Sequence, residues 1–132
     1  MVRKFGVYLT DELYEKLQEY VNKLGVRSKS KLLQEALRLF IVEHQWKLGG
    51  NVVGLIGIVY DHEYPDVDNR LTDVQHRYIS LIVSTVHVHL DKRKCMLAII
   101  VRGDAEKIRK LLNDLMNIRG VLLTRQILLP VE

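Results

Sequence analysis

Residues His76–Cys95 read H-R-Y-I-S-L-I-V-S-T-V-H-V-H-L-D-K-R-K-C and contain three of the five histidines and the only cysteine of the chain. The run from Ile79 to Leu90 is rich in β-branched residues, which favours a strand. Side chains alternate between the two faces of a strand, so His87 and His89 are expected on the same face. This stretch therefore predicts a strand that presents two imidazoles side by side.

A hairpin after this strand would supply a third metal ligand. The polar run Asp91–Lys94 is typical of a turn, and the returning strand would bring Cys95 back beside the two imidazoles. Two imidazoles and a thiolate suit zinc, copper or nickel rather than magnesium or calcium. His76, at the end of the preceding helix, is a candidate fourth ligand, in its own chain or in a neighbouring one. The competing interpretation is a strand whose outward face happens to carry two histidines, with Cys95 as a small buried hydrophobe.

The composition is that of a folded globular protein. The chain has 132 residues, enough for one domain or two small ones, and small domains bury little core, so association is expected. No apolar run approaches the roughly 18 to 20 residues of a membrane helix, and the N-terminus lacks the apolar core of a signal peptide. We therefore expect a cytoplasmic protein without a membrane partner. A lone cysteine suits a reducing compartment or a metal.

The N-terminal third holds most of the positive charge and predicts a strand followed by two helices. The net charge is +4, and residues 1–51 contain nine Lys or Arg against six Asp or Glu, which indicates a polyanionic partner. Alternation over residues 4–9 predicts a short strand with one apolar face. Thr10 is expected to cap a helix that stops near Gly25, and Ser30 to cap a second helix that runs to about Trp46.

One strand and two short helices contain too little core to be stable alone, so this part is expected to dimerise. Two copies that pair their strands would present Lys4, Gly6 and Tyr8 outward as a ribbon that fits the major groove of DNA. The segments M-V-R-K-F-G-V-Y-L, T-D-E-L and R-S-K-S-K-L-L-Q-E-A-L resemble a ribbon-helix-helix repressor domain. The competing interpretation is a small dimerisation module with a polar ribbon face.

The remainder of the chain predicts a second domain. Leu48–Asn51, L-G-G-N, reads as a short flexible linker, so we expect one domain at residues 1–48 and another at residues 52–132. Periodicity in the second part predicts the order β-α-β-β-α-β, the ferredoxin-like motif, and thus an α+β fold. The expected strands are residues 52–60, 79–90, 96–101 and 121–129, with helices at residues 67–78 and between Gly103 and Gly120.

This order, with V-H-V-H and a cysteine six residues after the second histidine, resembles the nickel-responsive ribbon-helix-helix regulators over essentially the whole chain. The resemblance implies a homotetramer, a dimer of dimers, whose centre is formed by ACT-like domains. It also implies one Ni²⁺ per subunit, held by His87, His89 and Cys95 together with His76 of the partner subunit. Tyr60, His62 and Gln75 are implied to lie near that site.

The sequence also departs from this family's pattern. The family commonly has an acid two residues after the cysteine, where this chain has Leu97, which puts the tightness of metal binding in doubt. An interdomain cation site in the family uses two acids one turn apart, and here Glu35 is present but Lys31 occupies the other position. Gly6 provides no side chain at a ribbon position that usually reads bases, so the operator sequence does not carry over.

The expected function is that of a metal-responsive transcriptional regulator whose partner is a double-stranded DNA operator. Arg3, Lys4 and Tyr8 are expected to contact DNA from the ribbon. The start of the second helix, with the side chains of Arg27, Ser28 and Lys29, is expected to contact phosphates. Two other classes compete, namely an amino-acid-binding ACT protein with incidental histidines and a small metalloenzyme. No catalytic triad, phosphate-binding glycine loop or pair of catalytic carboxylates is present, so we do not expect an enzyme.

Overall fold

The computed structural model describes residues 1–131; Glu132, the last residue of the predicted second domain, lies outside the described residues. The chain forms two compact units, Met1–Ile41 and a second unit that begins at Val42. This division falls before the L-G-G-N segment because Trp46 is completely buried in the core of the second unit. The glycines of that segment, Gly49 and Gly50, both have positive φ, which a non-glycine residue rarely adopts.

The first unit contains α1 (Asp11–Lys23) and most of α2 (Lys29–Gln45). The predicted Thr10 cap is confirmed, since its Oγ1 accepts a hydrogen bond from the backbone N–H of Leu13 at 3.2 Å. The predicted Ser30 cap is wrong. The hydroxyl of Ser28 accepts a bond from the backbone N–H of Lys31 at 3.1 Å, so α2 begins earlier than expected.

The predicted strand near the N-terminus is absent from the single chain, in which residues 1–10 have no regular secondary structure. A strand requires a neighbour for its ladder of hydrogen bonds, and one chain supplies none here. No residue of α1 or α2 is buried, and Leu13, Leu24 and Leu37 are each more than half exposed. Exposed apolar residues of this kind are typical of a unit that completes its hydrophobic core by packing against another chain.

The second unit is an antiparallel four-stranded sheet with strand order β2-β3-β1-β4, which confirms the predicted ferredoxin-like arrangement. The strand predicted from Ile79 starts three residues later, because Ile79–Leu81 forms a short 3-10 helix. The elements are η1 (Trp46–Leu48), β1 (Asn51–Asp61), α3 (Val67–Arg77), η2 (Ile79–Leu81), β2 (Ile82–His89), β3 (Lys94–Asp104), α4 (Ala105–Met116) and β4 (Val121–Val131).

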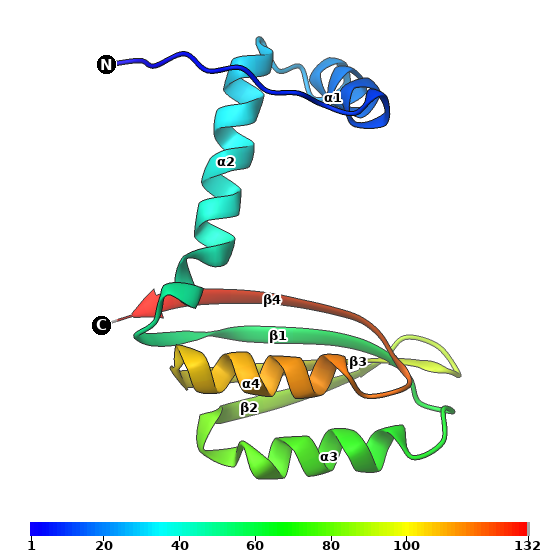
Figure 1. Ribbon diagram of the computed structural model, residues 1–132. Helices are drawn as coiled ribbons and strands as arrows, with labels where there is room; N and C mark the ends of the chain where they lie inside the picture. The colour runs from blue at the N-terminus through cyan, green and yellow to red at the C-terminus, as the bar shows by residue number, and fades with distance from the viewer. Residues whose placement is uncertain (132) are drawn as a thin grey trace. The chain divides into compact units, whose positions relative to one another are not determined.

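Helices α3 and α4 lie on the same side of the sheet (Figure 1). Alternate residues of β1 and β3, except Gly54 and Gly103, are buried beneath them, and apolar residues of both helices complete one core cluster. The carboxylate of Asp104 begins α4 by accepting a bond from the backbone N–H of Lys107 at 3.2 Å. His87 and His89 lie on the same face of the sheet as the core, because they pair with the buried residues Leu97 and Cys95.

At Gly54, β1 leaves no room for a side chain beside β4, and this contact yields a stability prediction. A Cβ at Gly54 would overlap the carbonyl oxygen of Ile127, so we expect Gly54→Ala to lower the free energy of unfolding by at least about 2 kcal/mol. Gly57→Ala is the matched control, since a Cβ there meets only the carbonyl oxygen of Arg125 at 3.7 Å. Thermal unfolding of both variants provides the measurement. Equal unfolding temperatures would show that the strands can separate enough to accept the methyl group.

Candidate metal centre

The hairpin of β2 and β3 brings together the three residues that the sequence placed at the start of a metal site. His89 pairs directly with Cys95, and His87 pairs with Leu97 two residues further along the ladder. The Sγ of Cys95 lies 3.5 Å from Nδ1 of His89, and the two imidazole centroids are 4.7 Å apart. One potential ligand atom from each of the three residues lies within 4.8 Å of the other two.

These separations fit a single metal ion after a small contraction. Ligand atoms about 2.0 to 2.3 Å from a metal lie roughly 3 to 3.5 Å from each other when they are neighbours around it. The distance between Cys95 and His89 is already in that range, and the widest separation in the cluster exceeds it by little more than 1 Å. Cys95 is 1% exposed, whereas both histidines are exposed, so the cluster is closed on the thiol side and open on the imidazole side.

His76 does not join this cluster within its own chain. It lies in the last turn of α3, whose buried residues include Leu71 and Val74. At 3.6 residues per turn, His76 lies roughly 200° around the helix axis from Val74, and its side chain is exposed. In the described chain, His76 therefore lies on the solvent-exposed side of α3.

Tyr60 contacts the cluster directly. Its hydroxyl lies 3.2 Å from Nε2 of His87, and the two rings are stacked with centroids 6.3 Å apart. Burial raises the pKa of Tyr60 to about 12, with smaller contributions from Asp68 and Cys95. The phenol is therefore protonated at neutral pH, and which group donates in its contact with Nε2 depends on the tautomer of His87. In the tautomer with hydrogen on Nε2, that N–H donates to the phenol oxygen and Nδ1 is left for a metal.

Gln75 and His62 lie around the cluster without contacting a ligand residue in the described chain. The amide oxygen of Gln75 accepts a hydrogen bond from the hydroxyl of Thr85 at 3.3 Å, and Thr85 is on the same face of β2 as His87. His62 instead reaches the turn, where its Nε2 lies 3.0 Å from the carbonyl oxygen of Lys92. Gln75 thus links α3 to β2 by a hydrogen bond, and His62 links the end of β1 to the turn.

The turn before Cys95 is itself organised by Asp91, a role that the sequence analysis did not assign. Its Oδ1 accepts hydrogen bonds from the backbone N–H groups of Arg93 at 2.8 Å and Lys94 at 2.7 Å. The bond from Lys94 and then the bond from Arg93 lower the pKa of the Asp91 carboxyl. Aspartate at the first position of a tight turn commonly makes this contact, so the signal was present in D-K-R-K.

The candidate DNA-contacting residues all lie in the first unit. Arg3, Lys4 and Tyr8 are exposed on the N-terminal segment. Near the start of α2, the ammonium of Lys29 donates to the hydroxyl of Tyr14 at 3.1 Å and lies 4.9 Å from the centre of its ring. This hydrogen bond is the main reason that the pKa of Tyr14 is lowered.

The anion site expected at the start of α2 is smaller than the sequence indicated. The hydroxyl of Ser28 accepts the hydrogen bond of the backbone N–H of Lys31, so this N–H at the start of α2 is not free to face a phosphate. The N–H groups of Lys29 and Ser30 remain, together with the exposed Arg27 side chain.

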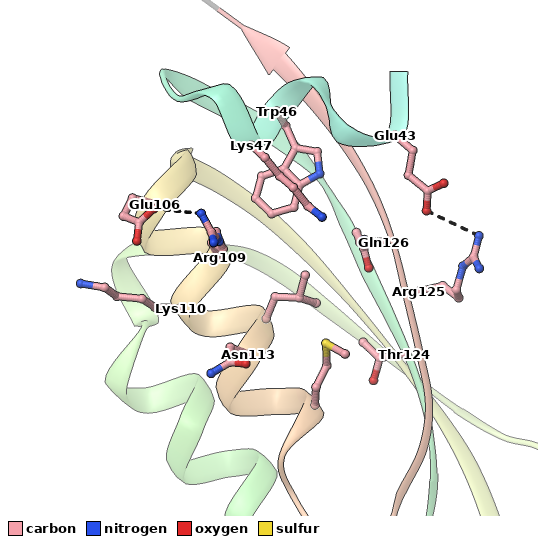
Figure 2. A pocket seen from close by; sticks show the side chains of 12 residues that line it. Glu43, Trp46, Lys47, Glu106, Arg109, Lys110, Asn113, Thr124, Arg125 and Gln126 are labelled. Carbon is pink, nitrogen blue, oxygen red and sulfur yellow. Dashed lines mark ion pairs between the residues drawn. The ribbon is translucent and has the colours of Figure 1, made fainter. Parts of the chain in front are cut away.

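A separate hollow of about 670 Å³ lies between α4, β4 and η1 (Figure 2). It contains none of the residues of the metal cluster. Its lining residues form two ion pairs, Glu43–Arg125 and, within α4, Glu106–Arg109, each at 3.7 Å. Trp46 and Lys47 line it on the side of η1, with the ammonium of Lys47 5.9 Å from the centre of the Trp46 ring. The hollow is therefore a feature of the fold distinct from the metal cluster.

Comparison with known proteins agrees with this geometry in both halves of the chain. Residues 53–128 match the family described as the NikR C terminal nickel binding domain, and residues 1–45 match the ribbon-helix-helix domain. A relative from Pyrococcus furiosus, named as a nickel-responsive regulator, is 40% identical over 119 residues, which is 89% of this chain and 86% of the relative. Relatives of the same name from Dictyoglomus thermophilum and Methanocaldococcus jannaschii are each 36% identical, covering 89% of this chain and 88% and 85% of their own lengths.

The fold alone is shared with a solved structure of an uncharacterized protein from Thermotoga maritima. The TM-score is 0.50 at 15% identity, and the match covers 64% of this chain and 99% of the other. Within the part of the chain that the structure describes, no helix is long and apolar enough to cross a membrane.

A ribbon-helix-helix domain joined to an ACT-like domain with a histidine and cysteine cluster defines a metal-responsive DNA-binding regulator. The chain belongs to the family of nickel-responsive ribbon-helix-helix regulators. This is a family of transcriptional regulators and not of enzymes, as the sequence analysis predicted.

Proposed function

We propose that the protein is a nickel-responsive transcriptional regulator of the cytoplasm, in which metal bound by His87, His89 and Cys95 controls affinity for a double-stranded DNA operator. The observation that carries this proposal is the convergence of two imidazoles and a buried thiol within 4.8 Å in a chain whose N-terminal part matches a ribbon-helix-helix domain. Bound nickel would supply a cross-link between the edge strand β2 and the inner strand β3. The expected stoichiometry is one Ni²⁺ per subunit.

We propose that His76 of the partner subunit completes each site in a homotetramer, a dimer of dimers. The sheet supports this assembly, because the face without helices carries apolar residues on all four strands, together with Arg102 and Arg125. Large exposed apolar patches mark interaction surfaces, and a second copy of the same face is the simplest complement. The apolar residues of this open face are Val53, Leu55, Val59, Val86, Val88, Met96, Ala98, Ile100, Leu123, Ile127 and Leu129.

Subunit mixing tests where the fourth ligand comes from. Neither His76→Ala nor Cys95→Ala has a complete site, but a mixed tetramer would contain complete sites if His76 acts across subunits. We expect each variant alone to bind nickel poorly and the co-refolded mixture to recover about a quarter of the native sites, by random association of equal amounts. Nickel titration with separation of unbound metal gives the count. No recovery in verified mixed oligomers would assign His76 to its own chain or to no site.

On the DNA side, we propose that two chains pair their N-terminal segments into a ribbon in which Arg3, Lys4 and Tyr8 face the major groove. The exposed apolar residues of α1 and α2 support this pairing, because a second copy would bury them. The start of α2, including Arg27, Ser28 and Lys29, would contact phosphates. Tyr14 would then hold the Lys29 side chain in place through its hydroxyl and ring face.

Substitutions in the ribbon separate sequence reading from general attraction to DNA. We expect Lys4→Ala and Tyr8→Ala to change preference among operator sequences, because they would remove contacts to base edges, worth about 1 to 3 kcal/mol each. Arg27→Ala should weaken binding to all sequences alike and reduce the salt dependence. Lys16→Ala, an exposed lysine of α1, is the matched control. Mobility shifts at fixed salt provide the comparison, and unchanged preference in both ribbon variants would remove the ribbon as the reader.

A further inference from the structure

The turn that joins the two metal-binding strands is held from outside by the end of β1. The guanidinium of Arg93 donates to the carboxylate of Asp61 at 2.6 Å, and its Nε lies 3.4 Å from Glu63. The backbone N–H of His62 donates to the carbonyl oxygen of Arg93 at 2.7 Å. The imidazole of His62 reaches the carbonyl oxygen of Lys92 at 3.0 Å, which requires the tautomer with hydrogen on Nε2.

This arrangement is more than a surface ion pair. The Asp61 side chain is only 16% exposed, and its other oxygen accepts the backbone N–H of Glu63 at 3.0 Å, which fixes the carboxylate for Arg93. An isolated exposed ion pair contributes little, but a pair with a fixed partner and adjacent backbone bonds constrains geometry better. Asp61, His62 and Glu63, at and directly after the end of β1, thus contact two consecutive residues of the turn, Lys92 and Arg93.

These contacts matter for the hairpin because of the position of β2 in the sheet. It is an edge strand that pairs only with β3, and its residues from Val83 to His89 are exposed, so packing does not hold it. The pair of His89 and Cys95 is the last of the ladder before the turn. The distance between these two candidate ligands therefore depends on how well the turn is closed.

We propose that Arg93, through Asp61, is a positioning residue that holds the turn closed and keeps His89 and Cys95 at metal-binding distance. This inference rests on the proposed nickel binding and adds a determinant outside the ligand set. Residues that orient metal ligands without contacting the metal typically change affinity 10- to 100-fold, and we expect Arg93→Ala to weaken nickel binding about 10-fold.

A neighbouring lysine provides a matched control that separates position from charge. Lys92→Ala removes one positive charge from the same turn but leaves intact the backbone carbonyl that His62 uses. Loss of a nearby positive charge alone should strengthen binding of a divalent cation, in both variants. Weaker binding in Arg93→Ala together with unchanged or tighter binding in Lys92→Ala therefore identifies a geometric role. Arg93→Lys, which keeps a donor for Asp61, should recover part of the affinity.

The metal-free protein supplies a second readout that does not depend on nickel. The backbone N–H groups of Leu90 and Asp91 both donate to the carbonyl oxygen of Lys94, at 3.0 and 3.2 Å, and they close the turn. We expect their hydrogen exchange to be about 10-fold faster in Arg93→Ala than in Lys92→Ala, at equal global stability.

Equal exchange rates and equal nickel affinities in these two variants would overturn the inference. If the native chain did not bind nickel, the proposed function would fail, and the exchange rates alone would still decide whether Arg93 holds the turn.

Discussion

Cys95→Ala is expected to abolish tight nickel binding, with a loss of more than about 100-fold in affinity. Residues that only orient ligands already account for 10- to 100-fold, and Cys95 is the sole thiol near the cluster, so its removal should cost more. Thiolate is also the soft member of the set, and it favours nickel over hard cations. The imidazoles of His87 and His89 would remain on the exposed edge strand. They would bind a metal weakly and could not link β2 to β3.

Electronic absorption of the purified protein titrated with nickel tests this expectation. The native chain should develop sulfur-to-nickel charge-transfer absorption, and Cys95→Ala should show none. Free cysteine packs as a small hydrophobe, so the variant should keep its fold, which circular dichroism of the metal-free protein can verify. The variant has no cysteine, so it cannot show thiolate-to-nickel charge-transfer absorption. Tight nickel binding retained through other ligands would rule out the hairpin cluster as the metal centre.

Much of the candidate site could be predicted from sequence because it depends on short-range rules. Alternation in a strand places His87 and His89 on one face, and a tight turn fixes the register that returns Cys95 beside them. The β-α-β-β-α-β order likewise followed from periodicity, since each segment has a clear apolar pattern.

The features that escaped sequence analysis depend on alternatives or on contacts distant in the chain. Ser28 and Ser30 are both good helix caps, and only the hydrogen bond to the N–H of Lys31 distinguishes them. The interaction of Arg93 with Asp61 links residues 32 positions apart, so no local pattern announces it. The strand expected before Thr10 has no neighbouring strand to pair with in the described chain, and a local pattern does not reveal that.

Nickel is expected to raise or lower operator affinity by about 5- to 150-fold, which corresponds to a coupling of roughly 1 to 3 kcal/mol between the two sites. Metal completed by His76 of the partner subunit would bind fully only in the assembled tetramer, so occupancy would favour one arrangement of the central domains. The chain passes from the first unit to the second within α2, between Ile41 and Val42. By reciprocity, operator DNA should change nickel affinity by the same factor.

The central claim is tested most directly by operator affinity measured with and without nickel, at one salt concentration because phosphate contacts make affinity salt-dependent. The native chain, Cys95→Ala, His76→Ala and the Lys16→Ala control are compared on the promoter DNA of the protein's own gene. We predict that nickel shifts affinity at least 5-fold in the native chain and in the control, and by less than about 2-fold in the two ligand variants. Equal affinities with and without nickel in the native chain would contradict metal-controlled DNA binding.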